Sequence, residues 1–503
     1  MGHGTTEQRG APAFKCHLDD KEPNPIASRD PALTVARRWS LTMSMSKLAA
    51  AGDGWADLPR DLLESVLARL PVPDRLRFPA VCTAWQSAAA TGASGSNAPL
   101  SPWLMLPINP TARGRPRRGG GGDARFLSLA EGRAYAIRQP ASAVSEHVCV
   151  GSSPDGWLIT ADASSELHLL NPVTGAQVQL PSVATLPFVD ATRGADGCVE
   201  SYSLRRCFAD DDCGDEVLIP PETLAPDRLR YEVYEKAIVV SAPRRLASPS
   251  GETWGGYALV LICQPLSRVA VARAGDAGWT LLDTPARCWV DAVRAAGADG
   301  VVYAMDTAGR VEAWDMDVTP APAPSRVAIA PPCRCSARAC AMSAACRRYL
   351  VELAPGHLLQ VHRLRGAAHA GYTWEPRPEH VEYATTGAEL FEWRAAGAGG
   401  GGRWARVDGE GASRVLGGRA LFLGKSASLC VPVDCSGSGG ELRGNRVYFT
   451  DDGPWSHERC HEVAPDVGVL DLADGSYRPP RGAARDLLWK WPPPVWVFPS
   501  LAS

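Results

Sequence analysis

Short apolar runs, each closed by a turn, follow one another from Phe126 onward and constrain the fold of this 503-residue chain more than any other feature. One set consists of Gly156–Thr160, Leu167–Leu170 and Gln177–Leu180, with Asn171–Gly175 as a turn between the last two. Runs of this length, bounded by Gly, Pro, Asn and Asp, are typical of antiparallel strands. We therefore predict an all-β region in which no amphipathic helix continues for long.

The same pattern recurs along the chain at a spacing of roughly 45 to 50 residues, which is the spacing of propeller blades. Small sheets that expose both faces and their edges are stabilised by radial stacking. We therefore predict a β-propeller over residues 126–500. Its further strands are expected at 257–263, 268–272, 279–282, 301–305, 310–314, 349–353, 358–363, 419–423, 429–433, 446–450 and 467–472.

Residues 55–90 have a different, helical pattern. A helix that opens near Pro59 and stops at Pro71 places five apolar side chains on one stripe, because they recur at helical spacing. Asp61 puts negative charge at the positive end of the helix dipole. The five side chains are Leu62, Leu63, Val66, Leu67 and Leu70.

Two more short helices are expected after Pro71. Pro73 and Asp74 open the second, Pro79 interrupts it, and Val81, Ala84, Trp85 and Ala88 give the third an apolar face. A unit below about 40 residues usually needs a disulfide, a metal or a partner for stability. We therefore interpret the remaining apolar face as a docking surface, with an ordinary helical hairpin as the alternative.

The order and spacing of these residues resemble the F-box motif. The matching positions are Leu58-Pro59, Asp61-Leu62-Leu63, Leu70-Pro71, Asp74, Leu76, Val81-Cys82 and Trp85, whereas Gln86 stands where many relatives carry Arg. The resemblance implies an F-box over 55–92 that docks onto the Skp-type adaptor of a cullin–RING ubiquitin ligase, while the rest of the chain selects the substrate. The adaptor-binding residues that it implies are Leu58, Pro59, Leu62, Leu63, Val66, Leu67, Leu70, Pro71, Leu76, Val81, Cys82 and Trp85.

The C-terminal part resembles the plant F-box-associated propeller family, which follows F-boxes. The segments that carry this resemblance are 348–352, 416–424, 444–452 and 467–472. It implies a small all-α F-box motif followed by a large all-β domain, a kelch-like propeller. It does not identify the client.

The remaining segments contain few apolar residues in any periodic order. We expect a disordered leader over 1–50 and a flexible Gly/Pro/Arg-rich linker over 93–125. The linker contains Arg113-Gly114-Arg115-Pro116-Arg117-Arg118, which resembles an AT-hook and also suits a nuclear import signal. We favour a solvated basic linker over a DNA contact, and expect no nucleic-acid partner.

Composition indicates an ordinary soluble protein, with 45% hydrophobic residues, 21% charged residues and a formal net charge of −3. The first fifty residues hold no signal-peptide core, and the longest later apolar run, Tyr257–Cys263, falls short of the roughly 20 residues of a membrane helix. We expect a nuclear or cytoplasmic location and no membrane partner. In that reducing setting the 15 cysteines are expected to be thiols.

Motifs for catalysis or metal binding are weak. The spacing of Cys333, Cys335, Cys340 and Cys346, and of His457, Cys460 and His461, fits paired zinc ligands poorly. Ser153–Trp157 lacks the spacer of a hydrolase aspartate box and is better explained as a strand turn. The acidic run 210–216 is interpreted as a solvated loop. We predict no catalytic residue, no metal and no cofactor.

These observations favour a non-catalytic substrate receptor of an SCF-type ligase, in which the F-box binds the adaptor and the propeller binds a client for ubiquitination. Proximity would be its contribution, because a bound client meets the charged conjugating enzyme at high effective concentration. The alternatives are a propeller hydrolase with an incidental F-box and a nuclear, DNA-tethered regulator.

Overall fold

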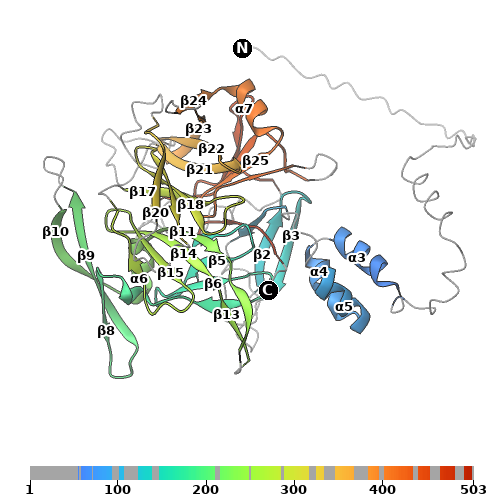
Figure 1. Cartoon of the computed structure of the whole chain (residues 1–503), viewed down its shortest axis with the longest axis horizontal. Coiled ribbons are helices and arrows are strands. Elements are labelled where there is room, and N and C mark those ends of the chain that lie inside the picture. Colours follow the sequence, from blue (N-terminus) through green and yellow to red (C-terminus); the bar gives the residue numbers. More distant parts are fainter. Residues whose placement is uncertain are drawn as a thin grey trace, which may run out of the picture.

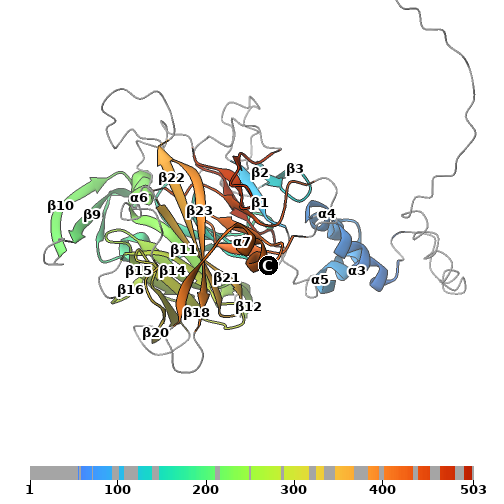
Figure 2. The same cartoon turned by 90° about the horizontal axis from the view of Figure 1, so that it is seen from above.

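The computed structural model describes residues 55, 58–70, 72–92, 101–106, 123–138, 147–209, 216–248, 251–284, 288–316, 325–333, 346–367, 383–395, 402–433, 440–453, 465–481 and 492–500. A group of helices stands beside a much larger body of strands (Figure 1). In both views the helices lie next to the hairpin of β2 and β3 (Figure 2). The predicted leader, the Arg113–Arg118 motif and the acidic run up to Asp215 lie outside the described residues.

The helical group consists of α3 (Arg60–Arg69), α4 (Val72–Arg77), the 3₁₀ turn η2 (Phe78–Ala80) and α5 (Thr83–Gly92). Pro59 precedes α3, where its carbonyl accepts from the backbone N–H groups of Leu62 at 3.0 Å and Leu63 at 3.1 Å. Pro79 lies in the 3₁₀ turn, because a proline cannot donate the bond that would continue α4. The predicted three-helix pattern is present.

Most of the described strands outside this group form six small sheets in a ring. Sheet I is β3-β2-β1-β30, sheets II and III are the halves β4–β7 and β11-β14-β15-β16 of one eight-stranded sheet, and sheets IV, V and VI are β17–β20, β21–β24 and β25–β29. Their bounds are β1 Trp103–Leu106, β2 Asp123–Ser128, β3 Arg133–Arg138, β30 Val495–Val497, β4 Val148–Ser152, β5 Leu158–Ala161, β6 Leu167–Leu170, β7 Gln177–Gln179, β11 Tyr234–Ser241, β14 Ala258–Cys263, β15 Arg268–Arg273, β16 Thr280–Leu281, β17 Trp289–Arg294, β18 Val301–Asp306, β19 Val311–Asp315, β20 Ser325–Ala330, β21 Cys346–Ala354, β22 His357–Ala367, β23 Tyr383–Arg394, β24 Arg403–Val407, β25 Ala420–Leu423, β26 Leu429–Val431, β27 Arg446–Phe449, β28 Gly468–Asp471 and β29 Tyr477–Arg478.

A hydrophobic cluster fills each junction between consecutive sheets. The cluster between sheets III and IV includes Val260 and Trp314, and the next, between IV and V, includes Met305 and Leu358. Others join I to II, II to III and V to VI. The last joins VI back to I, where Phe422 lies 5.1 Å from Trp496 between ring centroids. The sheets therefore close into the radial arrangement typical of a propeller.

Sheet I is built from both ends of the ring. Strand β30 pairs with β1 through Trp103 opposite Val497 and Met105 opposite Val495, and β1 then pairs with β2. The prediction that 93–125 is only a linker is therefore wrong for residues 103–106 and 123–125. The four residues of β1 are too few to show alternation, and three are buried because neighbouring sheets cover both faces.

Most predicted strands are confirmed in position and pairing. Strand β6 spans Leu167–Leu170 as predicted, and the turn at Asn171–Gly175 has Gly175 in the left-handed region at φ 75°. Ser153–Trp157 is also a turn, in which Ser153 Oγ accepts from the N–H groups of Asp155 and Trp157, both at 3.2 Å. The sequence pattern therefore located strands in sheets II to VI, whereas it missed sheet I and the strands β4, β11, β17, β20, β23, β24 and β29.

Two described sheets lie outside the ring and were not predicted. One has the order β10-β9-β8, formed by β8 (Val189–Arg193), β9 (Val199–Ala209) and β10 (Glu216–Leu224), and it projects from the body in Figure 1. The other is the hairpin β12 (Arg244–Ser248) and β13 (Gly251–Gly255). Short helices α6 (Pro226–Val233) and α7 (Gly409–Leu416), with the 3₁₀ turn η4 (Val183–Thr185), complete the fold.

Candidate functional site

The candidate adaptor site lies on the helices α3 to α5, which have a small core of their own. Leu63, Leu67, Phe78 and Ala88 are buried there. Two of the predicted adaptor-binding residues, Leu63 and Leu67, therefore face inward in this structure. They can support the surface, whereas a partner would have to displace the core to contact them directly.

Trp85 on α5 contacts both the core of the helical group and the chain that precedes α3. Its ring lies 4.3 Å from that of Phe78 between centroids, and its Nε1 donates to the backbone carbonyl of Trp55 at 3.0 Å. This side chain is partly buried, and it links α5 both to the core and to the chain entering α3. Trp85 therefore organises the candidate site as well as lining it.

The outward surface of the helical group is partly apolar. Val81 is 57% exposed and Trp55 is 76% exposed, both high values for large hydrophobic residues. Pro59 is also exposed, and Leu58, Leu62, Val66, Leu70 and Cys82 are half-buried. Pro71 and the side chain of Leu76 lie outside the described residues. Trp55 was not among the predicted site residues, although its place at the start of the stretch made it a candidate.

Tryptophan is common among the residues that dominate protein interfaces, so we considered five ring tryptophans as client contacts, and most of them lie inside the fold. Trp279, Trp289 and Trp314 are buried, and the rings of Trp289 and Trp314 meet edge to face at 4.7 Å between centroids. Trp393 is half-buried, whereas Trp455 lies outside the described residues. The three buried residues pack between blades and present no surface to a client.

A buried ion pair joins sheets III and IV. Lys236 Nζ on β11 lies 2.7 Å from Asp291 Oδ1 on β17. Asp291 Oδ2 accepts from the backbone N–H of Leu350 and from Ser428 Oγ, each at 2.9 Å. Four sheets, III to VI, therefore meet through one carboxylate. Because these groups satisfy one another, the arrangement is suited to holding the blades in register.

A second buried charge cluster joins sheets V and VI around Arg363 on β22. Its guanidinium lies 2.7 Å from Asp452 Oδ1 and 3.1 Å from Asp466 Oδ2. Burial alone would raise the pKa of Asp452, but the Arg363 charge holds that pKa at about 2. Arg363 also lies over the rings of Tyr349 and Phe449. The carboxylate thus stays ionised as a structural partner of the arginine.

The cysteines considered as zinc ligands are only partly described. Cys333 and Cys346 are buried, and burial raises the pKa of the Cys333 thiol to about 12. The remaining members of both groups lie outside the described residues. Within the part of the chain that the structure describes, no three His, Cys, Asp or Glu side chains gather as metal ligands, and no helix is long and apolar enough to cross a membrane.

Two family models match the chain. The model described as the KIB1-4 beta-propeller matches residues 126–471, and the F-box domain model matches residues 55–91. An F-box/kelch-repeat protein of Arabidopsis thaliana is 33% identical over 140 residues, which are 28% of this chain and 36% of that protein. The F-box protein KIB4 of the same plant is 28% identical over 126 residues, 25% of this chain and 30% of KIB4.

A third Arabidopsis thaliana relative, the F-box protein KIB3, is also 28% identical over 126 residues, which cover 25% of this chain and 26% of KIB3. The matched region therefore spans about a third or less of the length of each of these relatives. The second model covers the helical group with its exposed apolar surface, and the first covers most of the ring.

Proposed function

The chain belongs to the KIB1-4 β-propeller family and carries an F-box domain, and we propose that it is a substrate receptor of an SCF-type cullin–RING ubiquitin ligase. The F-box would dock onto the Skp-type adaptor, and the ring would bind a protein client for ubiquitination and degradation. The observation that carries this proposal is the helical group, which has its own core and leaves Val81 and Trp55 exposed beside a separately closed ring.

The proposed adaptor surface includes Leu58, Pro59, Leu62 and Val81, with Leu63, Leu67 and Phe78 as its support. Apolar residues at the centre of an interface commonly contribute most of the binding energy. We propose that the ring is a kelch-like propeller, that the chain acts in the nucleus or cytoplasm, and that ubiquitin transfer occurs elsewhere in the complex. No bond is made or broken by the receptor itself.

The proposal is tested by co-purifying the full-length chain with a Skp-type adaptor. Val81→Asp should reduce capture of the adaptor by roughly thirtyfold, since losing a central contact costs about 2 kcal/mol. Because Val81 is 57% exposed, the substitution should leave the F-box folded. Ser65→Asp, at an exposed position on α3, is the matched control. Unchanged adaptor capture by Val81→Asp together with Leu62→Asp would refute the proposed docking.

A propeller hydrolase remains the competing function, and the contacts of the carboxylates inside the ring test it. Asp291 and Asp452 are already engaged with Lys236 and Arg363. Burial raises the pKa of Glu235, although this group also accepts from Ser267 Oγ at 2.9 Å. Such pairing favours a structural role. Hydrolysis of a panel of ester and glycoside substrates that is lost in Glu235→Gln would support the hydrolase instead.

A further inference from the structure

We call β3, β7, β16, β20, β24 and β29, each at one edge of its sheet, the outer strands. They differ in how well their open edges are protected. An unpaired edge presents backbone N–H and C=O groups to any extended chain, and short length, charges or prolines normally prevent such pairing. Three of the outer strands are short: β7 has three residues, and β16 and β29 have two each. The longer outer strands are β3, β20 and β24.

Charge distinguishes β20 from the other two long outer strands. Strand β3 begins with Arg133 and ends with Arg138, and β24 carries Arg403 and Arg406. Strand β20, with the sequence Ser-Arg-Val-Ala-Ile-Ala, carries the single charge of Arg326 and contains no proline. By the usual rules of edge protection, β20 is the least protected of the three.

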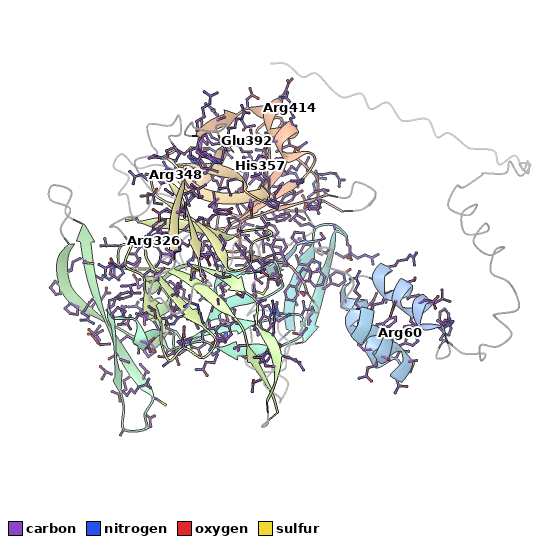
Figure 3. The ribbon with its side chains drawn as sticks, viewed as in Figure 1. Arg60, Arg326, Arg348, His357, Glu392 and Arg414 are labelled. Atoms are coloured by element: carbon purple, nitrogen blue, oxygen red, sulfur yellow. The ribbon has the colours of Figure 1, made fainter. Side chains whose placement is uncertain are left out.

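Solvent reaches both faces of β20 as well as its edge. Its first four residues are exposed, and Val327 is 57% exposed. Among the described strands, β20 pairs only with β19, with Arg326 opposite Trp314 and Val327 opposite Ala313. Figure 3 labels Arg326 on this strand. In an antiparallel pair, alternate residues direct their backbone groups away from the partner strand. Among the described residues, none pairs with these groups, which are therefore available at the open edge.

We infer that β20 is the site where an extended segment of the client adds to sheet IV as a further strand. This inference rests on the proposed receptor function and specifies the chemistry of its client. In strand addition, backbone hydrogen bonds supply affinity and alternate side chains supply specificity. The client segment places a carboxylate beside Arg326 and a β-branched side chain beside Val327, because opposite charges and β-branched residues form the favourable cross-strand pairs.

Charge also argues against a second copy of this chain in the two registers that bring its Arg326 side chains together. Two β20 strands paired about a two-fold axis centred on Arg326 or between Arg326 and Val327 bring two arginines to opposite or neighbouring positions. Like charges placed so closely across strands are unfavourable. An acidic client segment removes this repulsion, whereas β20 itself contains no carboxylate to do so.

The test uses the full-length chain purified with its adaptor and three fluorescein-labelled peptides. The first is Thr-Val-Thr-Glu-Val-Thr-Val. The second has Lys in place of Glu, and the third has Pro in place of the Val that directly follows Glu. Fluorescence anisotropy should show the tightest binding for the Glu peptide. It should show none for the Pro peptide, because proline has no backbone N–H to donate to β20 at that position. Hydrogen exchange should slow at residues 325–330 when the Glu peptide binds.

Two substitutions locate the binding to β20. Arg326→Glu should weaken the Glu peptide by roughly two- to fivefold and strengthen the Lys peptide by a similar factor, the usual size of one cross-strand charge pair. Val327→Lys should weaken both peptides, whereas Val327→Thr keeps the branching and should retain binding. Leu246→Lys is the matched control, since Leu246 on β12 is a comparable apolar residue with 49% exposure.

Three results would overturn the inference. The first is no saturable binding of the Glu peptide at millimolar concentration, and the second is equal loss of binding in Leu246→Lys. The third is a wild-type dimer in sedimentation that Val327→Lys dissociates, which would assign the edge to a second copy. Adaptor capture is measured on the same preparations. Lost peptide binding with intact adaptor capture therefore rejects only this inference, whereas lost adaptor capture would reject the proposed function.

Discussion

Lys236 and Asp291 form a salt bridge of 2.7 Å between neighbouring sheets of the ring, and both side chains are buried. The aspartate also binds Ser428 Oγ and the backbone N–H of Leu350, so the pair connects parts of the chain far apart in sequence. A buried ion pair of this kind is weak evidence for net stabilisation, but removing one partner leaves an uncompensated charge. The ring should therefore be sensitive to single changes at this point.

We expect Asp291→Ala to lower the free energy of unfolding by about 3 to 5 kcal/mol, because Lys236 would stay buried without a counter-charge. Lys236→Met combined with Asp291→Ala should recover part of that loss, since no unpaired charge is then left at this position. Urea denaturation of the full chain measures the free energy of unfolding of the two single variants and of the double variant. A double variant as unstable as the sum of the two single variants would show that the pair is not coupled.

The ion pair between Arg363 and Asp452 predicts a loss of stability in acid. The pKa of Asp452 is depressed from 3.8 to about 2 in the folded protein. Its contribution is therefore fully present above about pH 4 and is lost as the pH falls toward 2, and it amounts to about 2 kcal/mol. Asp452→Asn should remove this contribution. The difference in unfolding free energy between the wild type and this variant should shrink between pH 4 and pH 2.

A control checks that this acid effect is local. Asp190→Asn removes an exposed ion pair with Arg205, and such pairs contribute little. The difference in unfolding free energy between this variant and the wild type should stay small throughout the same pH range. If the difference in unfolding free energy between the wild type and Asp452→Asn did not change with pH, this would contradict the ion pair as the source of the acid effect.

The sequence predicted the elements whose patterns are local. Leu167–Leu170 lies between clear turn residues, and Pro59 and Pro71 bound α3, so each could be located from neighbouring residues alone. Strand β1 could not, because Trp103–Leu106 lies between β2 and β30 and pairs on one side with Val495–Val497 at the far end of the chain. Local patterns do not contain such distant partners.

The candidate site was predicted by residue type but not by orientation. The apolar stripe on α3 was recognised, yet which of its members face inward depends on Phe78 and Ala88 from other elements. The sequence alone therefore could not separate Leu63, which is buried, from its half-buried neighbour Leu62. Likewise, the exposure of Val81 follows from its place just before α5, outside the helical periodicity.

Closure of the ring by β1 predicts opposite outcomes for two deletions that the sequence alone would treat as equivalent. Deleting 103–106 should lower the melting temperature strongly, because it removes the partner of β30 and the buried Trp103 and Leu104. Loss of one large buried aromatic alone costs about 3 to 5 kcal/mol. Deleting 93–100, which precedes the strand, should leave the melting temperature of the ring nearly unchanged. Differential scanning calorimetry of the two variants decides between a strand and a linker.

The contacts of Trp85 predict that its packing and its hydrogen bond can be separated. Trp85→Phe keeps an aromatic ring against Phe78 but removes the N–H that donates to the carbonyl of Trp55. Losing that bond should lower the free energy of unfolding of the F-box by about 1 kcal/mol and weaken adaptor capture severalfold. Trp85→Ala, which also removes the ring contact and opens a cavity, should cost about 3 kcal/mol or more and abolish adaptor capture.

The ring supplies the control for this last pair of variants. Its sheets close without α3 to α5, so both substitutions at Trp85 should leave the main thermal transition of the ring unchanged while they reduce adaptor capture. Adaptor capture follows the F-box, and near-ultraviolet signals from buried ring tryptophans such as Trp289 follow the propeller. If Trp85→Ala also shifted the ring transition, the F-box and the ring would form one cooperative unit, which would contradict a ring that closes independently of α3 to α5.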